Sequence, residues 1–198
     1  MEHLNAKDKL TARLISNPAL LGAMMIKGVY KAECRDKDGN LKWTAEGENH
    51  VTTEGINFML DTLMAGSGYS VTGPYMGLIS SVSYSTTAIT DVAAQIGGTN
   101  GWEEASSSNA PDYSGNRKTC AWDAADAHAI SLSAALAFTF TEGGTVKGAF
   151  IVLGTGASAT KENTSGKLFS AGVFSGGDKV VADTDILNVS YTVTITDT

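Results

Sequence analysis

The sequence predicts a mainly β fold, namely an antiparallel β-sandwich of the jelly-roll kind with an N-terminal helical arm and one short helix. Three observations indicate it. Apolar and polar residues alternate in several runs, of which 130–140 and 186–196 are the clearest, and this period of two is that of a half-buried strand. The 22 glycines and only 3 prolines suit short strands joined by tight turns. Hydrophobic residues make up 42% of the chain, so a core can form.

Residues 1–26 are expected to form a helical arm outside the β-sandwich domain, which spans 27–198. Apolar residues recur on one side of the stretch 5–16, Asn17-Pro18 interrupts it, and a second apolar stretch follows. The arm either packs on its own domain or reaches a neighbouring subunit, and the sequence leaves both open. Its candidate partner-binding residues are Leu10, Leu14, Leu20, Leu21 and Met24.

A hairpin is predicted at the start of the domain. Tyr30, Ala32 and Cys34 share one face of its first strand, and Asp38-Gly39 is a favoured turn pair. The return strand then runs through Leu41 and the residues after it.

A short helix is predicted over 52–66, with Thr52 or Thr53 as its cap. Its apolar residues have the i, i+3, i+4, i+7 spacing of a helix face that packs on a core. We therefore expect these residues, Ile56, Met59, Leu60 and Leu63, to be buried.

A long polar loop at 81–115 follows a predicted strand within 73–81. Loops of this length in compact domains usually bind something or contact another subunit. Trp102 and Tyr113 lie in this loop and are further candidate partner-binding residues. Local packing beneath the loop is the alternative for both.

The clearest strand pattern, 130–140, is predicted to form a β-hairpin with 144–153 through the turn Glu142-Gly143-Gly144. The second of these strands is apolar on both faces, with Val146 assigned to the same face as Phe150, which predicts a central strand covered on both sides. Strands within 167–196 complete the eight or nine that we expect.

No pattern of residues predicts catalysis, a metal site or a cofactor site. The three histidines are scattered, and none lies beside a Ser or Cys in a nucleophile motif. The acidic pairs Glu103-Glu104 and Asp123/Asp126 lack the ligand ladder of a cation site, so we expect them to be solvated. Cys34 and Cys120 are expected to be buried and unpaired, with a cross-strand disulfide as the alternative that a reducing place of synthesis disfavours. We therefore expect a protein that is not an enzyme.

Charge argues against a nucleic-acid partner. Residues 1–42 hold 8 Lys+Arg and 5 Asp+Glu, while the other residues hold 6 and 16, for a net charge of −7. An acidic body repels a phosphate backbone. No apolar run has the length of a membrane span, and no secretory signal peptide is recognised, so we expect neither a membrane partner nor export.

Five stretches occur in a characteristic order: TTEGINFMLDTLMAG (52–66), GPYMGLISS (73–81), ITDVAAQIGGTNGWEE (89–104), Tyr113 to Arg117 with CAW after it, and FTFTEGGTVKGAFIVLG (138–154). In this order they resemble structural virion proteins of tailed bacteriophages, especially short-tailed ones, over about residues 27–195. The resemblance implies a β-sandwich virion component without a catalytic site.

The resemblance is greatest to a capsid decoration, or cement, protein. It implies binding to the major capsid protein and to further copies of itself, as a dimer or trimer, on the capsid surface after assembly in the host cytoplasm. A tail or head-fibre/adaptor component is one alternative. A glycan-binding adhesion module is another, and it would present Trp102 or Trp43 as an open platform.

Overall fold

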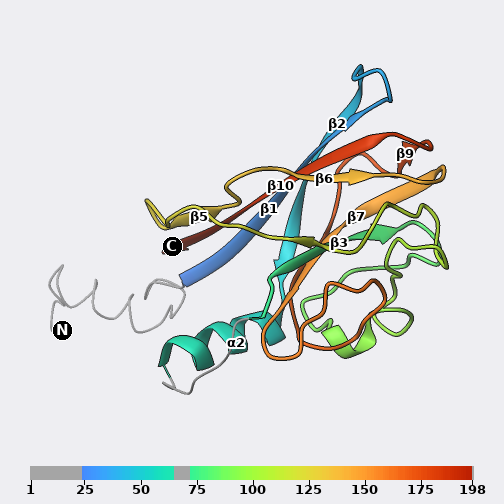
Figure 1. Cartoon of the computed structure of the whole chain (residues 1–198). Helices are drawn as coiled ribbons and strands as arrows, with labels where there is room; N and C mark the ends of the chain where they lie inside the picture. Colours follow the sequence, from blue (N-terminus) through green and yellow to red (C-terminus); the bar gives the residue numbers. More distant parts are fainter. Residues whose placement is uncertain (1–23, 65–71, 198) are drawn as a thin grey trace, which may run out of the picture.

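The structure, a computed structural model, describes residues 24–64 and 72–197, and these are mainly β (Figure 1). The strands are β1 (Met24–Arg35), β2 (Leu41–Val51), β3 (Tyr75–Ser80), β4 (Lys118–Thr119), β5 (Ala129–Ser131), β6 (Leu136–Thr139), β7 (Gly144–Leu153), β8 (Lys167–Val173), β9 (Lys179–Val181) and β10 (Ile186–Asp197). The helices are α2 (Thr53–Met64) and the short 3-10 helix η2 (Ala93–Gln95). The mainly β prediction and its short helix are thus confirmed.

The predicted arm, 1–26, lies outside the described residues except for its last three. These are strand, because β1 pairs with β10 along its whole length, from Met24 opposite Asp197 to Arg35 opposite Ile186. The prediction of helix is therefore wrong for Met24, Met25 and Ile26.

The strands form one antiparallel sheet in the order β4-β3-β7-β8-β2-β1-β10-β5, with β6 on β10 and β9 on β7. This sheet is strongly curled (Figure 1). Trp122 forms an isolated bridge with Leu132, and the Asp123 amide donates to the Ser131 carbonyl. These contacts join the segment after β4 to the opposite edge of the sheet, so the curled sheet encloses a core.

The first predicted hairpin is confirmed, since β1 pairs with β2. Gly39 in its turn has φ +84°, a left-handed conformation that glycine adopts without strain. Tyr30, Ala32 and Cys34 are all buried, as the alternation predicts. This part of the fold follows from residues that are neighbours in sequence.

The second predicted hairpin is wrong. The run 130–140 is divided into β5 and β6, and both of these strands pair with β10. Strand β7 pairs instead with β3, β8 and β9. The turn at 142–144 therefore connects two strands that pair with other strands and not with each other. The alternation of the run 130–140 arises because Leu132, Phe138 and Phe140 point into the core and are buried.

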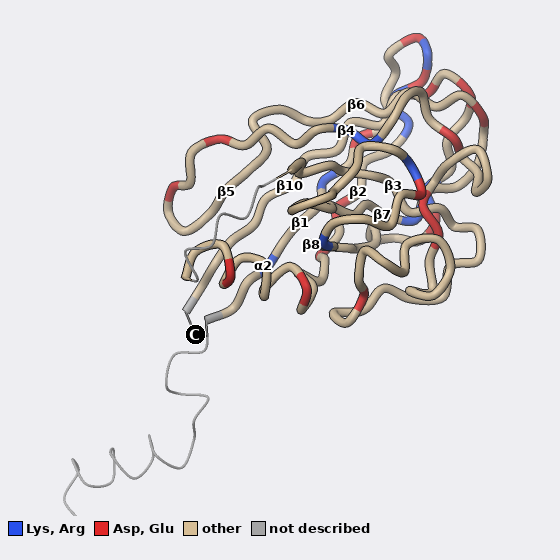
Figure 2. The backbone as a smooth tube through the Cα atoms, turned by 60° about the horizontal axis from the view of Figure 1, so that its bottom comes forward, with Lys and Arg blue, Asp and Glu red and all other residues tan. Residues whose placement is uncertain are grey.

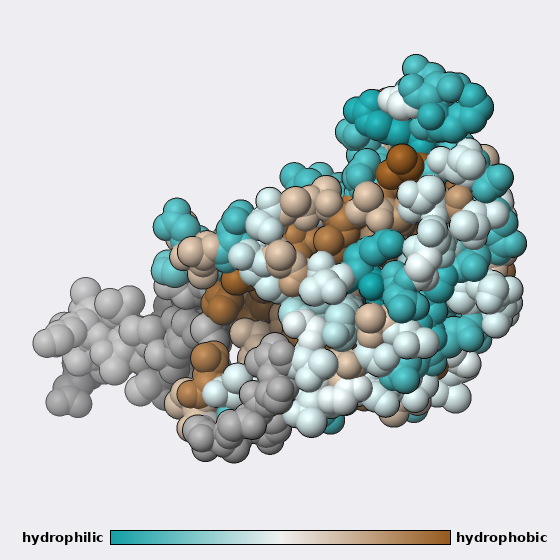
Figure 3. Space-filling view, in the orientation of Figure 1, coloured by the Kyte–Doolittle hydropathy of each residue, from teal (hydrophilic) through white to brown (hydrophobic). Residues whose placement is uncertain are grey.

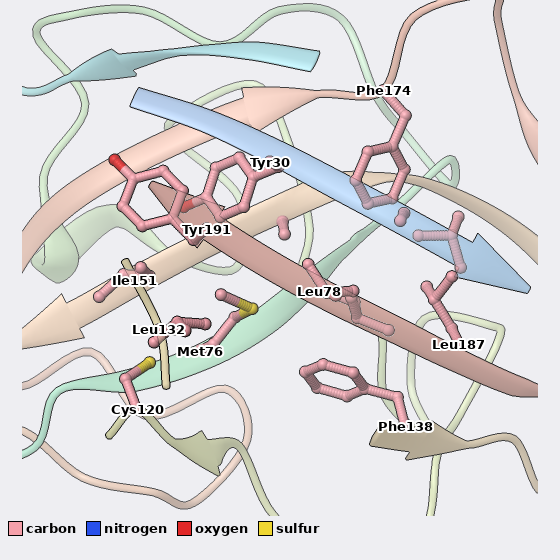
Figure 4. Close-up of a cluster of buried hydrophobic side chains, with 14 of the residues drawn as sticks. Tyr30, Met76, Leu78, Cys120, Leu132, Phe138, Ile151, Phe174, Leu187 and Tyr191 are labelled. Atoms are coloured by element: carbon pink, nitrogen blue, oxygen red, sulfur yellow. The ribbon is translucent and has the colours of Figure 1, made fainter. Parts of the chain in front are cut away.

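The main core lies inside the curled sheet (Figure 4). The Tyr30 and Tyr191 rings stack there with their centroids 4.4 Å apart. The Tyr30 hydroxyl lies 2.6 Å from the Ser170 hydroxyl, which satisfies a buried polar group. Neighbouring strands supply most of the remaining side chains, among them Met76, Leu78, Phe138 and Ile151.

Strand β7 is covered on both faces, as predicted. Ala149 and Ile151 belong to the core inside the sheet, whereas Phe150 and Val152 belong to a second cluster outside it. One detail of the prediction is wrong, because Val146 joins the inner core instead of the face of Phe150. The register between β3 and β7 shifts at this point, and an extra residue in a strand moves the side chains that follow to the other face.

Both cysteines are buried and unpaired, as expected. Burial raises the pKa of the Cys34 thiol from 9.0 to about 11, with the Asp185 carboxylate adding to the effect, and burial raises that of Cys120 to about 12. Above pH 9 the thiols of the unfolded chain lose their protons, while those of the folded chain keep them until pH reaches these raised values. Unfolding therefore releases protons, and stability must fall as pH rises.

We expect the free energy of unfolding to decline from pH 9 upward, measured by urea denaturation at pH 8, 9 and 10. The control is the variant Cys34→Ala/Cys120→Ala, which lacks both thiols. Its stability should decline less over this interval. An equal decline in both proteins would mean that the two thiols do not contribute.

Candidate functional site

Helix α2 is fixed to the domain at its N-terminus. The predicted cap is confirmed: the Thr52 hydroxyl accepts a hydrogen bond from the Gly55 amide at 3.0 Å and donates one to the Leu168 carbonyl. The Glu54 carboxylate accepts from the amides of Leu168 at 2.8 Å and Ala93 at 2.9 Å. The first turn is therefore held against β8 and η2, and Phe58 is buried beneath it.

The predicted core face of α2 is exposed over its second half, which contradicts the sequence-based expectation. Ile56 and Met59 pack partly on the core. Leu60 is 51% exposed, Leu63 74% and the neighbouring Met64 81%. Leu60 and Leu63 instead form one wall of an open depression whose other side includes Met25 of β1 and Ile195 of β10, so the second half of the helix does not pack on the sheet. Figure 1 shows α2 beside this end of the sheet.

An apolar groove lies between α2 and the ends of β1, β5 and β10, and we call it the α2-end groove. Its half beside β5 is a depression of about 400 Å³ lined almost wholly by apolar atoms, including those of Trp122, Ile130, Phe169 and Val193. Its half beside β1 is a depression of about 490 Å³ with Met25, Ile56, Leu60 and Leu63 in its walls. Met59 and Ile195 line both halves, which makes the groove continuous.

Hydrophobic surface gathers around this end of the molecule, near α2 and β5 (Figure 3). Charged residues around it are mostly acidic: α2 contributes Asp61, the segment before β5 contributes Asp123 and Asp126, and β1 contributes one exposed cation, Lys27. Elements α2, β5 and β10 hold no Lys or Arg within their described bounds, and Figure 2 shows hardly any basic residues along α2 and β5. The groove is thus an apolar surface with an acidic rim.

The candidate loop residues are not exposed. Trp102 and Tyr113 are each 1% exposed, so local packing, the alternative reading of both, is confirmed. The Trp102 indole donates to the Asp91 carboxylate at 2.9 Å, and its ring lies 5.1 Å from that of Phe150. Neither side chain is available on the surface of this chain as a partner contact.

The other candidate residues cannot be placed in the same way. Leu10, Leu14, Leu20 and Leu21 lie outside the described residues, and Met24 is described only as the first residue of β1. The prediction that they bind a partner remains a prediction.

Glu104, predicted to be solvated, is instead wholly buried in an ion pair with Arg117. The Arg117 Nε–Glu104 Oε1 distance is 2.9 Å and the Nη2–Oε2 distance is 2.7 Å, with both side chains 0% exposed. Arg117 also donates to the carbonyls of Ser158 and Asn163. The pair therefore joins the 81–115 loop to the loop before β8. Asp123 and Asp126 are exposed, as predicted.

The tryptophans provide little support for an open sugar platform. Trp102 is buried, and the Trp43 indole donates to the Val180 carbonyl at 2.9 Å beside Phe174. Among residues 24–64 and 72–197, no three His, Cys, Asp or Glu side chains lie close enough together to hold a metal ion. In the same ranges, no helix combines the length and apolarity needed to span a bilayer.

No protein-family model, no curated protein sequence and no solved structure matches this chain. The geometry of the chain itself therefore carries the functional argument. The sequence had assigned Leu60 and Leu63 to the core, and the helical spacing that led to this assignment could not reveal that an open groove separates them from the sheet.

Proposed function

We propose that this chain is a structural protein of a tailed-bacteriophage virion, a decoration protein that binds neighbouring subunits of the outer capsid shell and stabilises the lattice. The observation that carries the proposal is the apolar α2 end, where Leu63 and Met64 are the most exposed large hydrophobic side chains of the described residues. Contiguous apolar surface on a folded domain commonly marks a protein-binding site.

Binding of this kind works by surface burial. A stable interface buries about 800 Å² on each partner, and the α2 end offers apolar side chains for its centre with carboxylates at its rim. The same contact repeated over a symmetric shell adds a modest free energy at every lattice position. The jelly-roll arrangement, which the spacing of the predicted strands suggested, remains part of this proposal, supported by the curled antiparallel sheet that encloses the main core.

The alternative placement is a tail or head-fibre/adaptor component, for which the same apolar end would contact a ring of other proteins. Copy number separates the two. Quantitative mass spectrometry of purified virions should find this chain at a simple ratio to the major capsid protein. A count that fits a single vertex would contradict the decoration role.

The proposal predicts the effect of charge at the α2 end. The variant Leu63→Glu/Met64→Glu should lower binding to purified shells by at least about tenfold in a co-sedimentation assay, since two carboxylates would be desolvated in the interface. Its free energy of unfolding should change by less than about 0.5 kcal/mol, because both side chains are exposed in the free domain.

The matched control is Val180→Glu. Val180 is also a large exposed hydrophobic residue, at 65%, but it lies on β9. This variant should bind shells as the unmodified chain does. Full binding by the Leu63/Met64 variant would show that α2 is not the docking surface.

A further inference from the structure

We infer that the α2-end groove is the docking site for residues 1–23 of the same chain. The described chain begins at Met24, and the next two residues, Met25 and Ile26, line the half of the groove beside β1. The 23 preceding residues therefore leave the domain at the rim of an apolar groove. This inference does not depend on the proposed virion role: Met64, the last residue of α2, does not line the groove, so it stays available to a capsid partner when the segment is docked.

The composition of residues 1–23 matches the groove. Their apolar side chains include Leu10, Leu14, Leu20 and Leu21. Burying a leucine side chain in an apolar groove removes it from water, which favours docking against the cost of ordering the chain. The groove takes such side chains in its two halves, which together are lined by residues of α2, β1, β5, β8 and β10.

Charge is complementary as well. The segment contributes Lys7, Lys9 and Arg13 against Glu2 and Asp8, so it is basic by one net charge. The groove rim contributes Asp61, Asp123 and Asp126, and none of these three belongs to an ion pair among the described residues. The described α2, β5 and β10 carry no Lys or Arg, and β1 adds one cation, Lys27, so acidic side chains outnumber basic ones around the groove.

Covalent attachment favours the chain's own segment over that of a second copy. A segment tethered directly at the rim has an effective concentration on the order of millimolar. A second copy at micromolar concentration competes at a disadvantage of roughly a thousandfold. Asn17-Pro18 is a sequence at which the segment can reverse direction. In this arrangement Leu20 and Leu21 enter the half of the groove beside β1. Leu10 and Leu14 enter the half beside β5.

Disulfide trapping in the full chain tests the inference. The variant Leu14→Cys/Ala129→Cys pairs the segment with β5 in the groove, and Leu14→Cys/Glu48→Cys pairs it with an exposed position on β2. Both target residues lie near the start of β1. Ala129 of β5 pairs with Thr194 of β10, and Thr194 pairs with Lys27 of β1. Glu48 of β2 pairs directly with Val29 of β1. Leu14 lies ten positions before Met24, and this length of chain spans at most about 35 Å, enough to reach either target.

We expect the 14–129 disulfide to form within one chain, at least about tenfold faster than the 14–48 disulfide. Peptide mapping by mass spectrometry distinguishes these bonds from any that involve the buried Cys34 and Cys120. Equal rates for the two pairs would overturn the inference. A disulfide-linked dimer as the main product would also overturn it, because the occupant would then be a second copy.

A third substitution separates apolar docking from simple proximity. Leu10→Asp added to the 14–129 pair should slow the reaction about tenfold, whereas Ala12→Asp, which adds the same charge away from the Leu10 and Leu14 side, should not. Equal slowing by both would contradict apolar docking. No capsid takes part in these measurements, so their failure leaves the decoration role to be judged by shell binding and copy number.

Discussion

Replacing Arg117 by Met is expected to lower the free energy of unfolding by about 3–5 kcal/mol, because it leaves the Glu104 carboxylate buried without its partner. Both side chains of the pair are 0% exposed. Arg117 also lies 5.2 Å from the centroid of the Phe150 ring and hydrogen-bonds carbonyls of the loop before β8. Urea denaturation at pH 7, followed by circular dichroism, measures the loss.

Two controls make this result specific. The double variant Glu104→Leu/Arg117→Met should be more stable than Arg117→Met alone, since no unpaired charge is then buried. Lys31→Met removes one partner of the exposed Lys31–Glu46 pair and should cost less than about 1 kcal/mol. If Arg117→Met costs no more than Lys31→Met, the buried pair does not hold the two loops together.

Replacing Trp102 by Ala should also destabilise the fold, by about 3–5 kcal/mol, as expected for deleting a large buried aromatic ring. Its indole packs on Phe150 outside the sheet and donates to Asp91, whose carboxylate would lose that donor. Thermal and urea denaturation measure the effect. The large cost follows from the 1% exposure of this side chain.

Trp122→Ala is the matched comparison, because Trp122 is only partly buried and lines the α2-end groove. We expect a smaller loss of stability there. A Trp102→Ala variant that remained fully stable and yet lost partner binding would contradict the structural role assigned to Trp102. It would restore the view that the loop binds the partner directly.

Patterns confined to neighbouring residues predicted the structure well. The β1–β2 hairpin follows from alternation on both sides of Asp38-Gly39, and α2 begins at the Thr52 cap. The alternation of β10 likewise places Leu187, Val189 and Tyr191 in the core. Each of these depends on periods of two or 3.6 and on turn or cap chemistry, which are local properties of a chain.

Features that depend on distant strands were not predicted. Strands β5 and β6 pair with β10 instead of β7, which joins residues 47 to 65 positions apart in the chain. No local pattern specifies which strand lies alongside. Burial of Glu104 likewise required Arg117 and the loop before β8 to meet around it. A carboxylate in a polar loop gives no local indication that its cation lies elsewhere in the chain.

The sequence by itself thus determined the β class of this protein, the position of its helix and the alternation that fills its core, because these follow from side-chain period and backbone preference. Only the tertiary structure decided which apolar residues are covered. Leu60 and Leu63 have the spacing of core residues, yet they are exposed because an open groove separates them from β1 and β10. Burial is set by which surfaces face one another, and the candidate docking surface therefore became visible only in the folded chain.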